Sequence, residues 1–321
     1  MAKLPEVSLN PTVEAIYKAY ENNAGHGFRL HLGASIIGRE CERSLWFDFR
    51  WTTKSSFNGR MLRLFETGQR EEERLVRNLR SIGVTVLDVN PKTGRQWQVS
   101  DHGGHFGGSL DGVALGVPEA PKTWHVCEFK THNIKSFNDL KAKGVQESKS
   151  QHYAQMQVYM YLFEMTRALY MAVCKDTDEI YAERVHADLA VGIRLLAKAK
   201  RIIDAPKPPS RINDDPAWYQ CRMCHHHTIC HEGMFSERNC RTCLHVTPTP
   251  DGQWLCERWT RTIPVNDQRQ GCFLHLYIPD LVAGEQVDVD HNGAWVEYRL
   301  PDGTIWRDGS GENSSVGGQK T

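Results

Sequence analysis

The sequence predicts an α/β fold, in which a mixed central β-sheet is flanked by helices and is followed by a small Cys-rich metal-binding module. Helix-type and strand-type periodicities follow one another through residues 59–204 in the order helix, strands, helix, strands, helix. That order favours a mixed sheet covered by helices. Beyond a Pro-rich connector at residues 205–216, seven of the ten cysteines fall within residues 221–272, which predicts a separate metal-binding part.

The elements are expected in a definite order. Residues 1–25 are expected to form a short amphipathic helix and a loop, and Ser35 to cap a helix through Trp46. A longer helix is predicted over residues 60–82, where Gly83 is a stop signal. The later expectations are strands at 84–89, 95–100, 105–115 and 124–131, a polar stretch at 132–150, a helix over 150–169, two strands within 169–185 and a helix over 189–204.

These elements divide the chain into five segments. They are an N-terminal helical region at 1–58 that carries Cys41, a core at 59–204, a linker and Cys-rich segment at 205–235, a second Cys-rich module with a β-hairpin at 236–307, and a disordered tail at 308–321.

Composition excludes several protein classes. Lysine and arginine together balance aspartate and glutamate, 39 against 39, so net charge does not indicate a partner. No run of about 18 apolar residues and no signal-peptide pattern occur, which favours a cytoplasmic protein without a membrane partner. Cysteines in such a chain are expected to bind metal rather than to form disulfides.

Charged residues interrupt the apolar strand "HVCEFKT", where Glu128 and Lys130 share one face and Phe129 lies between them. Burying such charges is costly unless an ion or a partner compensates them. Asp111 in "GGSLDGVAL" is expected on an adjacent strand. The two carboxylates, with the backbone carbonyl of Phe129, suit Mg²⁺ or Mn²⁺, and Lys130 would orient or deprotonate the attacking water. A buried structural ion pair is the alternative.

The stretch "GGSLDGVAL…HVCEFKT" resembles the G-x-x-D-G…(D/E)-x-K signature of the PD-(D/E)XK nuclease superfamily. Similarity extends to "FETGQREEERLVRNLRSIG" and to "QHYAQMQVYMYLF", which resembles the Q-x-x-x-Y helix of the RecB-like branch. The resemblance implies a restriction-endonuclease-like core. It also implies a metal-binding role for Glu72, with Glu71 next, and substrate positioning by Gln155 and Tyr159. His105, and with it His102, is a further candidate near the metal.

Three cysteines form the run "CRMCHHHTIC", namely Cys221, Cys224 and Cys230. A closed metal centre needs a fourth ligand, either a histidine of residues 225–227 or the distant Cys41. Cys41 lies in "GASIIGRECERSLWFDF", which resembles the N-terminal helix of iron–sulfur RecB-like nucleases, including the CRISPR-associated and AddB-type exonucleases. The resemblance implies a [4Fe–4S] cluster on the four cysteines, with zinc as the alternative.

A second group of cysteines follows in "CRTCLHVTPTPDGQWLC" and "GCFLH". Cys240, Cys243, Cys256 and Cys272 have the spacing of a zinc-ribbon-like module, and His275 is the alternative to Cys272. Four protein ligands leave no open position on the ion. The zinc is therefore expected to be structural.

The sequence thus favours a Mg²⁺- or Mn²⁺-dependent deoxyribonuclease. By resemblance it is expected to be an exonuclease that acts on single-stranded or end-containing DNA in recombination or repair, of the phage or mobile-element type included. A helicase or an annealing protein is the expected partner, and the expected location is the nucleoid of a bacterium or the cytoplasm of a phage host. A catalytically silent DNA-binding or assembly subunit is the alternative function. A zinc hydrolase at residues 225–227 is disfavoured because the sequence offers those histidines no paired acid.

Overall fold

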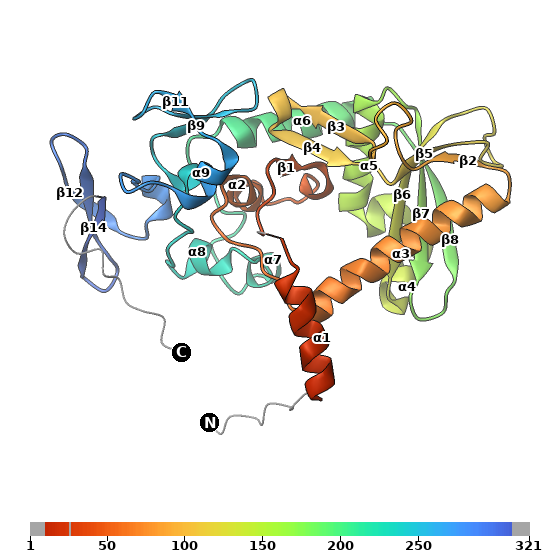
Figure 1. Cartoon of the computed structure of the whole chain (residues 1–321), viewed down its shortest axis with the longest axis horizontal. Helices are drawn as coiled ribbons and strands as arrows, with labels where there is room; N and C mark the ends of the chain where they lie inside the picture. Colours follow the sequence, from red (N-terminus) through yellow and green to blue (C-terminus); the bar gives the residue numbers. More distant parts are fainter. Residues whose placement is uncertain (1–9, 26, 310–321) are drawn as a thin grey trace. The chain divides into compact units, whose positions relative to one another are not determined.

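The computed structural model describes residues 10–25 and 27–309 (Figure 1). The chain forms two compact units. The core unit comprises Met1–Phe28, Ser55–Val99 and Gly108–Ile193, and the cysteine-rich unit comprises Arg29–Lys54, Ser100–Gly107 and Arg194–Thr321. Residues 29–54, which carry Cys41, therefore group with the C-terminal third of the chain and not with the N-terminal helix.

A five-stranded sheet of order β2-β5-β6-β7-β8 organises the core unit. Its strands are β2 (Thr85–Leu87), β5 (Gly112–Leu115), β6 (His125–His132), β7 (Arg167–Cys174) and β8 (Ile180–His186). β6 and β7 run parallel, whereas the other neighbouring pairs are antiparallel. The predicted mixed sheet is confirmed.

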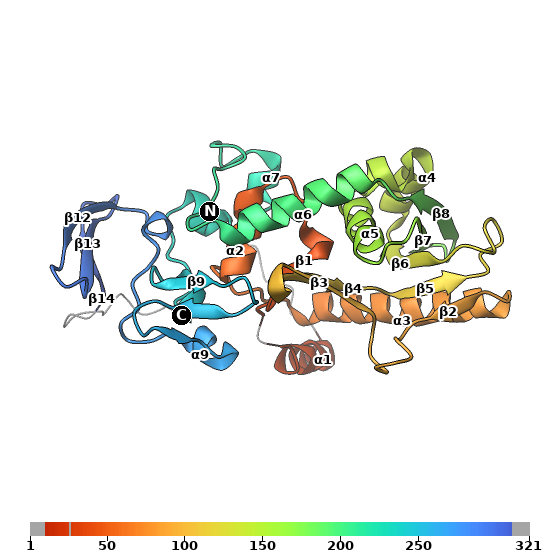
Figure 2. The same ribbon diagram turned by 90° about the horizontal axis from the view of Figure 1, so that it is seen from above.

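Helices cover both faces of this sheet. α3 (Gly59–Ser81) contacts β6 and β2, while α4 (Ile134–Ser148) and α5 (Ser150–Leu162) contact β6 and β7. Figure 2 shows α3 on one side of the strands and α4 and α5 on the other. Leu75 and Leu79 of α3 pack with Cys127 and Phe129 of β6 in one buried cluster. Because side chains alternate along a strand, Glu128 points to the opposite face.

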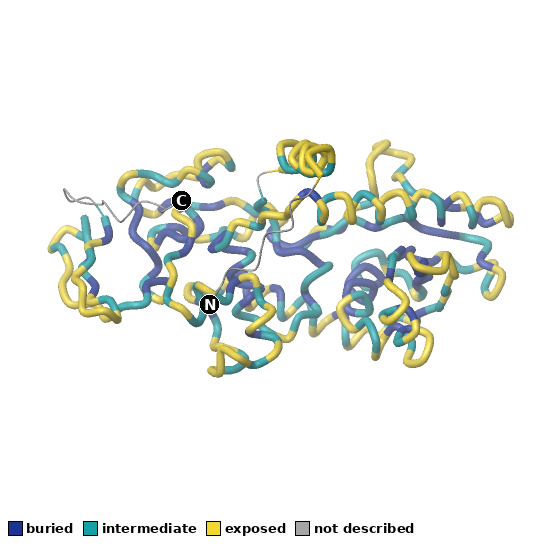
Figure 3. Tube along the Cα trace, turned by 90° about the horizontal axis from the view of Figure 1, so that it is seen from below, coloured by how far each residue is buried: buried dark blue, intermediate teal, exposed yellow. Residues whose placement is uncertain are grey.

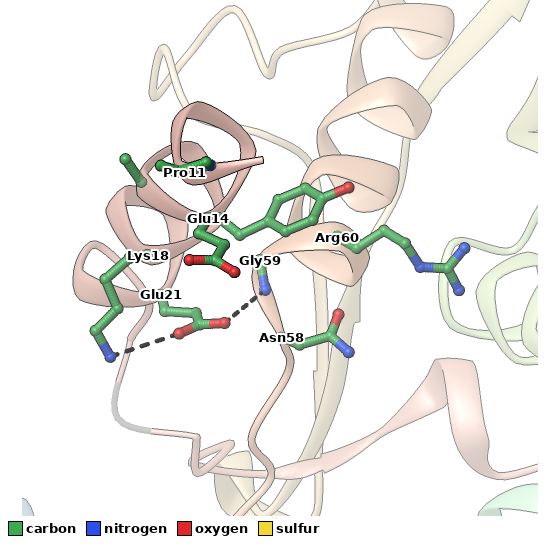
Figure 4. Close-up of a pocket in the computed structure, with 9 residues that line it drawn as sticks. Pro11, Glu14, Lys18, Glu21, Asn58, Gly59 and Arg60 are labelled. Carbon is green, nitrogen blue, oxygen red and sulfur yellow. Dashed lines mark hydrogen bonds and ion pairs between the residues drawn. The ribbon is translucent and has the colours of Figure 1, made fainter. Parts of the chain in front are cut away.

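The N-terminal helix of the core unit, α1 (Pro11–Asn22), begins at Asn10, whose side chain accepts from the amide of Thr12. None of its residues is buried, as the exposed coil in Figure 3 shows. Its Glu21 accepts a hydrogen bond of 2.9 Å from the amide of Gly59 at the start of α3. Figure 4 shows this contact beside an open pocket lined by Glu14 and Lys18, among others. The expected N-terminal helix is confirmed.

The cysteine-rich unit contains short elements. α2 (Glu42–Arg50), α7 (Tyr219–Arg222) and α8 (His227–His231) are helical. One small sheet has the order β11-β10-β9, and another has the order β12-β13-β14. These strands are β9 (Val246–Pro248), β10 (Trp254–Cys256), β11 (Arg261–Thr262), β12 (Glu285–Val289), β13 (Trp295–Arg299) and β14 (Ile305–Gly309). β1 (Leu32–Gly33) pairs in parallel with β4 (Phe106–Ser109), in a sheet that also holds β3 (Gln98–Asp101).

Three expectations for the first half of the chain are wrong. The helix expected from Ser35 is a short 3₁₀ turn, Ala34–Ile36, and α2 begins only after Cys41. The run 105–115 divides into β4 and β5 at the turn that carries Asp111. The polar stretch 132–150 is mostly α4, which buries Phe137 and Leu140 one turn apart among its charged residues.

The remaining differences lie further along the chain. α5 ends at Leu162, whereas α6 (Leu189–Asp204) has its predicted bounds. The C-terminal hairpin gains a third strand, β12. The disordered tail was predicted to begin at residue 308, but β14 extends to Gly309. Asp308 is buried and accepts a hydrogen bond from the amide of Tyr277. Residues 310–321 lie outside the described part. None of the described helices combines the length and the apolar character needed to cross a membrane.

Candidate functional site

Two carboxylates and one ammonium group meet where β5 and β6 pair. Asp111 precedes β5, and Gly112 lies opposite Cys127 in the antiparallel register, which places Asp111 beside Glu128. Oδ2 of Asp111 accepts a 2.7 Å hydrogen bond from the amide of Phe129 and lies 3.8 Å from Nζ of Lys130. A Cβ atom at Gly112 would lie 3.2 Å from the carbonyl oxygen of Leu87, so the turn after Asp111 favours glycine.

Glu128 is fully buried, and its carboxylate is incompletely compensated. Within the described part of the chain, Oε1 forms an ion pair with the ammonium of Lys130, and Oε2 has no partner. Burial raises the pKa of Glu128, although Lys130 opposes this shift. A buried carboxylate with free oxygen lone pairs suits a bound cation.

Lys130 lies between the acids. Its Nζ donates a 3.0 Å hydrogen bond to the carbonyl of Phe129, the predicted third metal ligand, and its side chain remains 27% exposed. Burial disfavours the charged ammonium, but Glu128 and Asp111 outweigh it and raise the pKa of Lys130. A lysine held in the charged form is suited to orienting water or offsetting phosphate charge rather than to removing a proton.

Glu72 projects from α3 toward the same acids. Burial first, and then the negative charge of Asp111, raise the pKa of Glu72 to about 7, although Lys130 opposes the shift. Glu71, the other candidate on this helix, lies 3.4 Å from Arg74 in an ion pair instead. The structure therefore brings Glu72 into the electrostatic field of Asp111 and gives Glu71 a separate partner.

Glu72 is expected to make Mn²⁺ binding pH-dependent. The pKa of a glutamate in the unfolded chain is about 4.3, whereas the pKa of Glu72 in the folded chain is about 7. Between these values the folded chain binds more protons, so the metal-free protein is expected to lose stability as pH rises through this window. Mn²⁺ affinity is expected to rise over the same window, because the ion needs the ionised carboxylate. Calorimetric Mn²⁺ titrations between pH 5 and pH 8 measure this.

The matched variants for this prediction are Glu72→Gln and Glu71→Gln. Glu72→Gln is expected to flatten the rise in affinity, and Glu71→Gln to retain it, because Glu71 pairs with Arg74. Equal pH profiles for wild type and Glu72→Gln would contradict the assignment.

Gln155 and Tyr159 lie one turn apart on α5 and are both buried. Nε2 of Gln155 donates to the hydroxyl of Tyr159 at 3.1 Å, and this hydroxyl donates to the carbonyl of Ser109 at 2.9 Å. Ser109 ends β4, two residues before Asp111. The pair therefore holds the backbone that presents Asp111, and the implied role in positioning substrate stays a prediction.

A histidine and tyrosine cluster beside Lys130 was not predicted. The hydroxyl of Tyr170 lies 2.9 Å from Nε2 of His132 and 2.9 Å from Nδ1 of His152. Burial, and then nearby lysines, lower the pKa of His132 to about 4 and that of His152 to about 3. The sequence spacing could have predicted these histidines near the site. His132 follows Lys130 by two residues on a strand, and His152 precedes Gln155 by three residues on a helix, so each shares a face with a site residue.

His105 lies in the cysteine-rich unit, whereas Asp111 and Glu128 belong to the core unit. Its Nε2 is 3.0 Å from the carbonyl oxygen of Thr249, and its ring packs edge-on against Phe49 and Trp254. His102 likewise contacts the carbonyl of Leu196 at 3.1 Å. The structure gives both histidines partners within their own unit.

Cys41 and the three cysteines of residues 221–230 all belong to the cysteine-rich unit. Cys41 caps the N-terminus of α2, and Cys221, Cys224 and Cys230 lie in and between α7 and α8. Burial raises the pKa of Cys221 and of Cys224, and negative charge on Cys41 and Cys230 adds to the shift in both cases. Cys221 and Cys224 therefore lie within the electrostatic influence of Cys41 and Cys230, and a shared metal centre stays a prediction. His227, a candidate fourth ligand, has its Nδ1 3.0 Å from the carbonyl of Cys221.

The second cysteine set, Cys240, Cys243, Cys256 and Cys272, also contains residues that influence one another electrostatically. Burial raises the pKa of Cys240 to about 12, with further contributions from Cys243, Cys272 and Cys256. His275, the alternative ligand, has its Nε2 3.2 Å from the hydroxyl of Thr242. The four-cysteine zinc set stays a prediction.

Two buried arginines accompany this second set. Arg50 is 3% exposed and Arg241 is 2% exposed, and in the described residues neither forms an ion pair with a carboxylate. Burial lowers the pKa of Arg50 to about 10, whereas negative charge on Cys243 opposes the shift. A metal bound by four thiolates carries net negative charge, which would offset buried guanidinium groups.

No protein-family model matches the sequence, and no curated protein matches it. Solved structures that are similar to the chain at low identity include the following three. The protein SSO0001 is 15% identical with a TM-score of 0.42, over 70% of this chain and 98% of that one. The alkaline exonuclease LHK-Exo from Laribacter hongkongensis is 17% identical with a TM-score of 0.38, and its complex with dAMP is 16% identical with the same TM-score. Both LHK-Exo structures match over 59% of this chain and 90% of that one.

Proposed function

We propose that the protein is a Mg²⁺- or Mn²⁺-dependent deoxyribonuclease that hydrolyses phosphodiester bonds at DNA ends, as an exonuclease in recombination or repair. The observation that carries this proposal is the fully buried carboxylate of Glu128 beside Asp111. Its Oε1 pairs with Lys130, and its Oε2 has no partner in the described chain. Glu72 supplies a third carboxylate coupled to Asp111. Such an all-oxygen set suits Mg²⁺ or Mn²⁺ better than softer ions.

Each residue has a distinct part in this proposal. Asp111, Glu128 and Glu72 would hold one or more divalent ions, which supply Lewis acidity toward the phosphate and lower the pKa of bound water. Lys130 remains cationic and faces the incoming phosphate charge. Gln155 and Tyr159 fix the backbone before Asp111. DNA with a single strand or a free end is the proposed substrate.

Digestion of end-labelled single- and double-stranded DNA tests the function. Wild type is expected to release labelled nucleotides in Mg²⁺ or Mn²⁺ and to be inactive in EDTA. Asp111→Asn is expected to lose cleavage, whereas Asp88→Asn is the control, since Asp88 pairs with Arg80. DNA binding without cleavage by wild type would favour the alternative, a silent DNA-binding or assembly subunit.

We further propose two structural metal centres. Cys41, Cys221, Cys224 and Cys230 would hold a [4Fe–4S] cluster, with zinc as the alternative, and Cys240, Cys243, Cys256 and Cys272 would hold zinc. The mutual electrostatic influence of the thiols supports both sets. The proposed location is the cytoplasm, where cysteines that bind metal would stay reduced. A helicase or an annealing protein remains the proposed partner.

A further inference from the structure

Three potential metal ligands from two segments converge inside the cysteine-rich unit. Asp48 lies on α2, and His225 and His226 lie between α7 and α8. Nε2 of His225 is 3.0 Å and Nε2 of His226 is 3.3 Å from Oδ1 of Asp48. The ligand atoms of these three residues all lie within 4.8 Å of one another. Two imidazoles and one carboxylate thus face a common point.

Neighbouring groups orient two of these ligands. Arg39 donates to Oδ2 of Asp48 at 2.7 Å, which leaves Oδ1 directed at the histidines. Nδ1 of His226 lies 2.8 Å from the hydroxyl of Thr53. If this nitrogen carries the proton, the Nε2 lone pair is available to an ion. Metal-binding histidines are commonly held in this way, through a hydrogen bond at the second ring nitrogen.

His226 supplies an independent indication of a ligand. His226 is 0% exposed, and its Nε2, although 3.3 Å from Oδ1 of Asp48, forms no hydrogen bond with any described residue. A buried ring nitrogen without a partner carries a desolvation cost that a bound cation would remove. The side chain of His225 is 41% exposed, so an ion and a water ligand have access from solvent.

We propose that Asp48, His225 and His226 bind one divalent transition-metal ion of the zinc class, separately from the thiol centres and from the acidic site. Two imidazoles with one carboxylate suit zinc and its neighbours, whereas magnesium favours an oxygen-rich set. Asp48 belongs to the helix that Cys41 caps, and both histidines lie between Cys224 and Cys230. The ion would therefore join the same two segments as the first group of cysteines, through different atoms.

Metal content of the full-length protein tests the site. The protein is reconstituted anaerobically, incubated with excess Zn²⁺, desalted and analysed for zinc, iron and acid-labile sulfide. His225→Ala is expected to lose one equivalent of zinc while iron and sulfide remain unchanged. His231→Ala is the matched control, because its ring lies in the same segment and stacks on that of His227 instead of facing Asp48, and it is expected to retain wild-type zinc.

Two results would overturn the proposal. Equal zinc in wild type and His225→Ala would leave Asp48 and the histidines as a hydrogen-bonded cluster only. Equal loss of zinc in His225→Ala and His231→Ala would assign the effect to disturbance of the cysteine segment. X-ray absorption at the zinc edge is a second measurement, and it uses only the wild-type protein, so it does not depend on whether a variant folds. Wild type is expected to show nitrogen or oxygen neighbours at about 2.0–2.1 Å as well as sulfur at about 2.3 Å, and a pure sulfur shell would contradict the site.

Discussion

Replacing Lys130 with methionine is expected to reduce DNA cleavage by about 10²- to 10⁴-fold. The ammonium is the cationic side chain that contacts both Asp111 and Glu128, and it retains exposure toward solvent. Methionine preserves much of the side-chain volume but removes the charge that faces the phosphate. The rate of nucleotide release from end-labelled DNA at saturating Mg²⁺ measures the loss.

A double variant separates catalysis from a purely structural ion pair. Lys130→Met leaves Glu128 buried without its charged partner, so the thermal midpoint is also expected to fall. Adding Glu128→Gln removes that charge and is expected to restore stability while cleavage stays absent. Lys143→Met, at an exposed lysine paired with Asp139, is the control and is expected to retain full activity. Recovery of cleavage together with stability in the double variant would overturn the catalytic assignment.

Arg241→Met is expected to destabilise the cysteine-rich unit by about 3 kcal/mol or more. The Arg241 guanidinium donates to Gln268, to the carbonyl of Phe49 and to the carbonyl of Leu30 at 3.0–3.2 Å. It also lies 3.6 Å from the ring centroid of Trp51. Methionine would leave three acceptors without this donor and would remove a cation–π contact. Urea unfolding of the metal-loaded protein measures the change.

Arg238→Met is the matched control, because Arg238 is close in the sequence and exposed. The free energy of unfolding of the Arg238→Met protein is expected to differ from that of wild type by less than about 0.5 kcal/mol. If negative thiolates offset the buried guanidinium, Arg241→Met is also expected to alter the affinity for zinc, which competition with a chromophoric chelator measures. A stability of Arg241→Met within about 0.5 kcal/mol of wild type would contradict the proposed role.

Local sequence was sufficient for the strand and helix that form the candidate site. The mixture of β-branched, aromatic and apolar residues around Glu128 predicted a buried central strand, and β6 is buried over most of its length. The apolar spacing of residues 60–82 predicted α3, although its first residue is Gly59. α4 was missed because its buried Phe137 and Leu140 are separated by polar residues that dominate the composition of the stretch.

The sequence by itself determined which residues share a strand face, which cysteines follow one another at metal-ligand spacing, and where helices of strong periodicity form. These properties depend on spacings of a few residues, which backbone geometry converts directly into shared faces. Only the tertiary structure decided that Asp48 meets His225 and His226, and that Arg241 lies buried without a carboxylate in the described chain. These contacts join residues far apart in the chain, and their geometry depends on how the elements of a unit pack rather than on any local period.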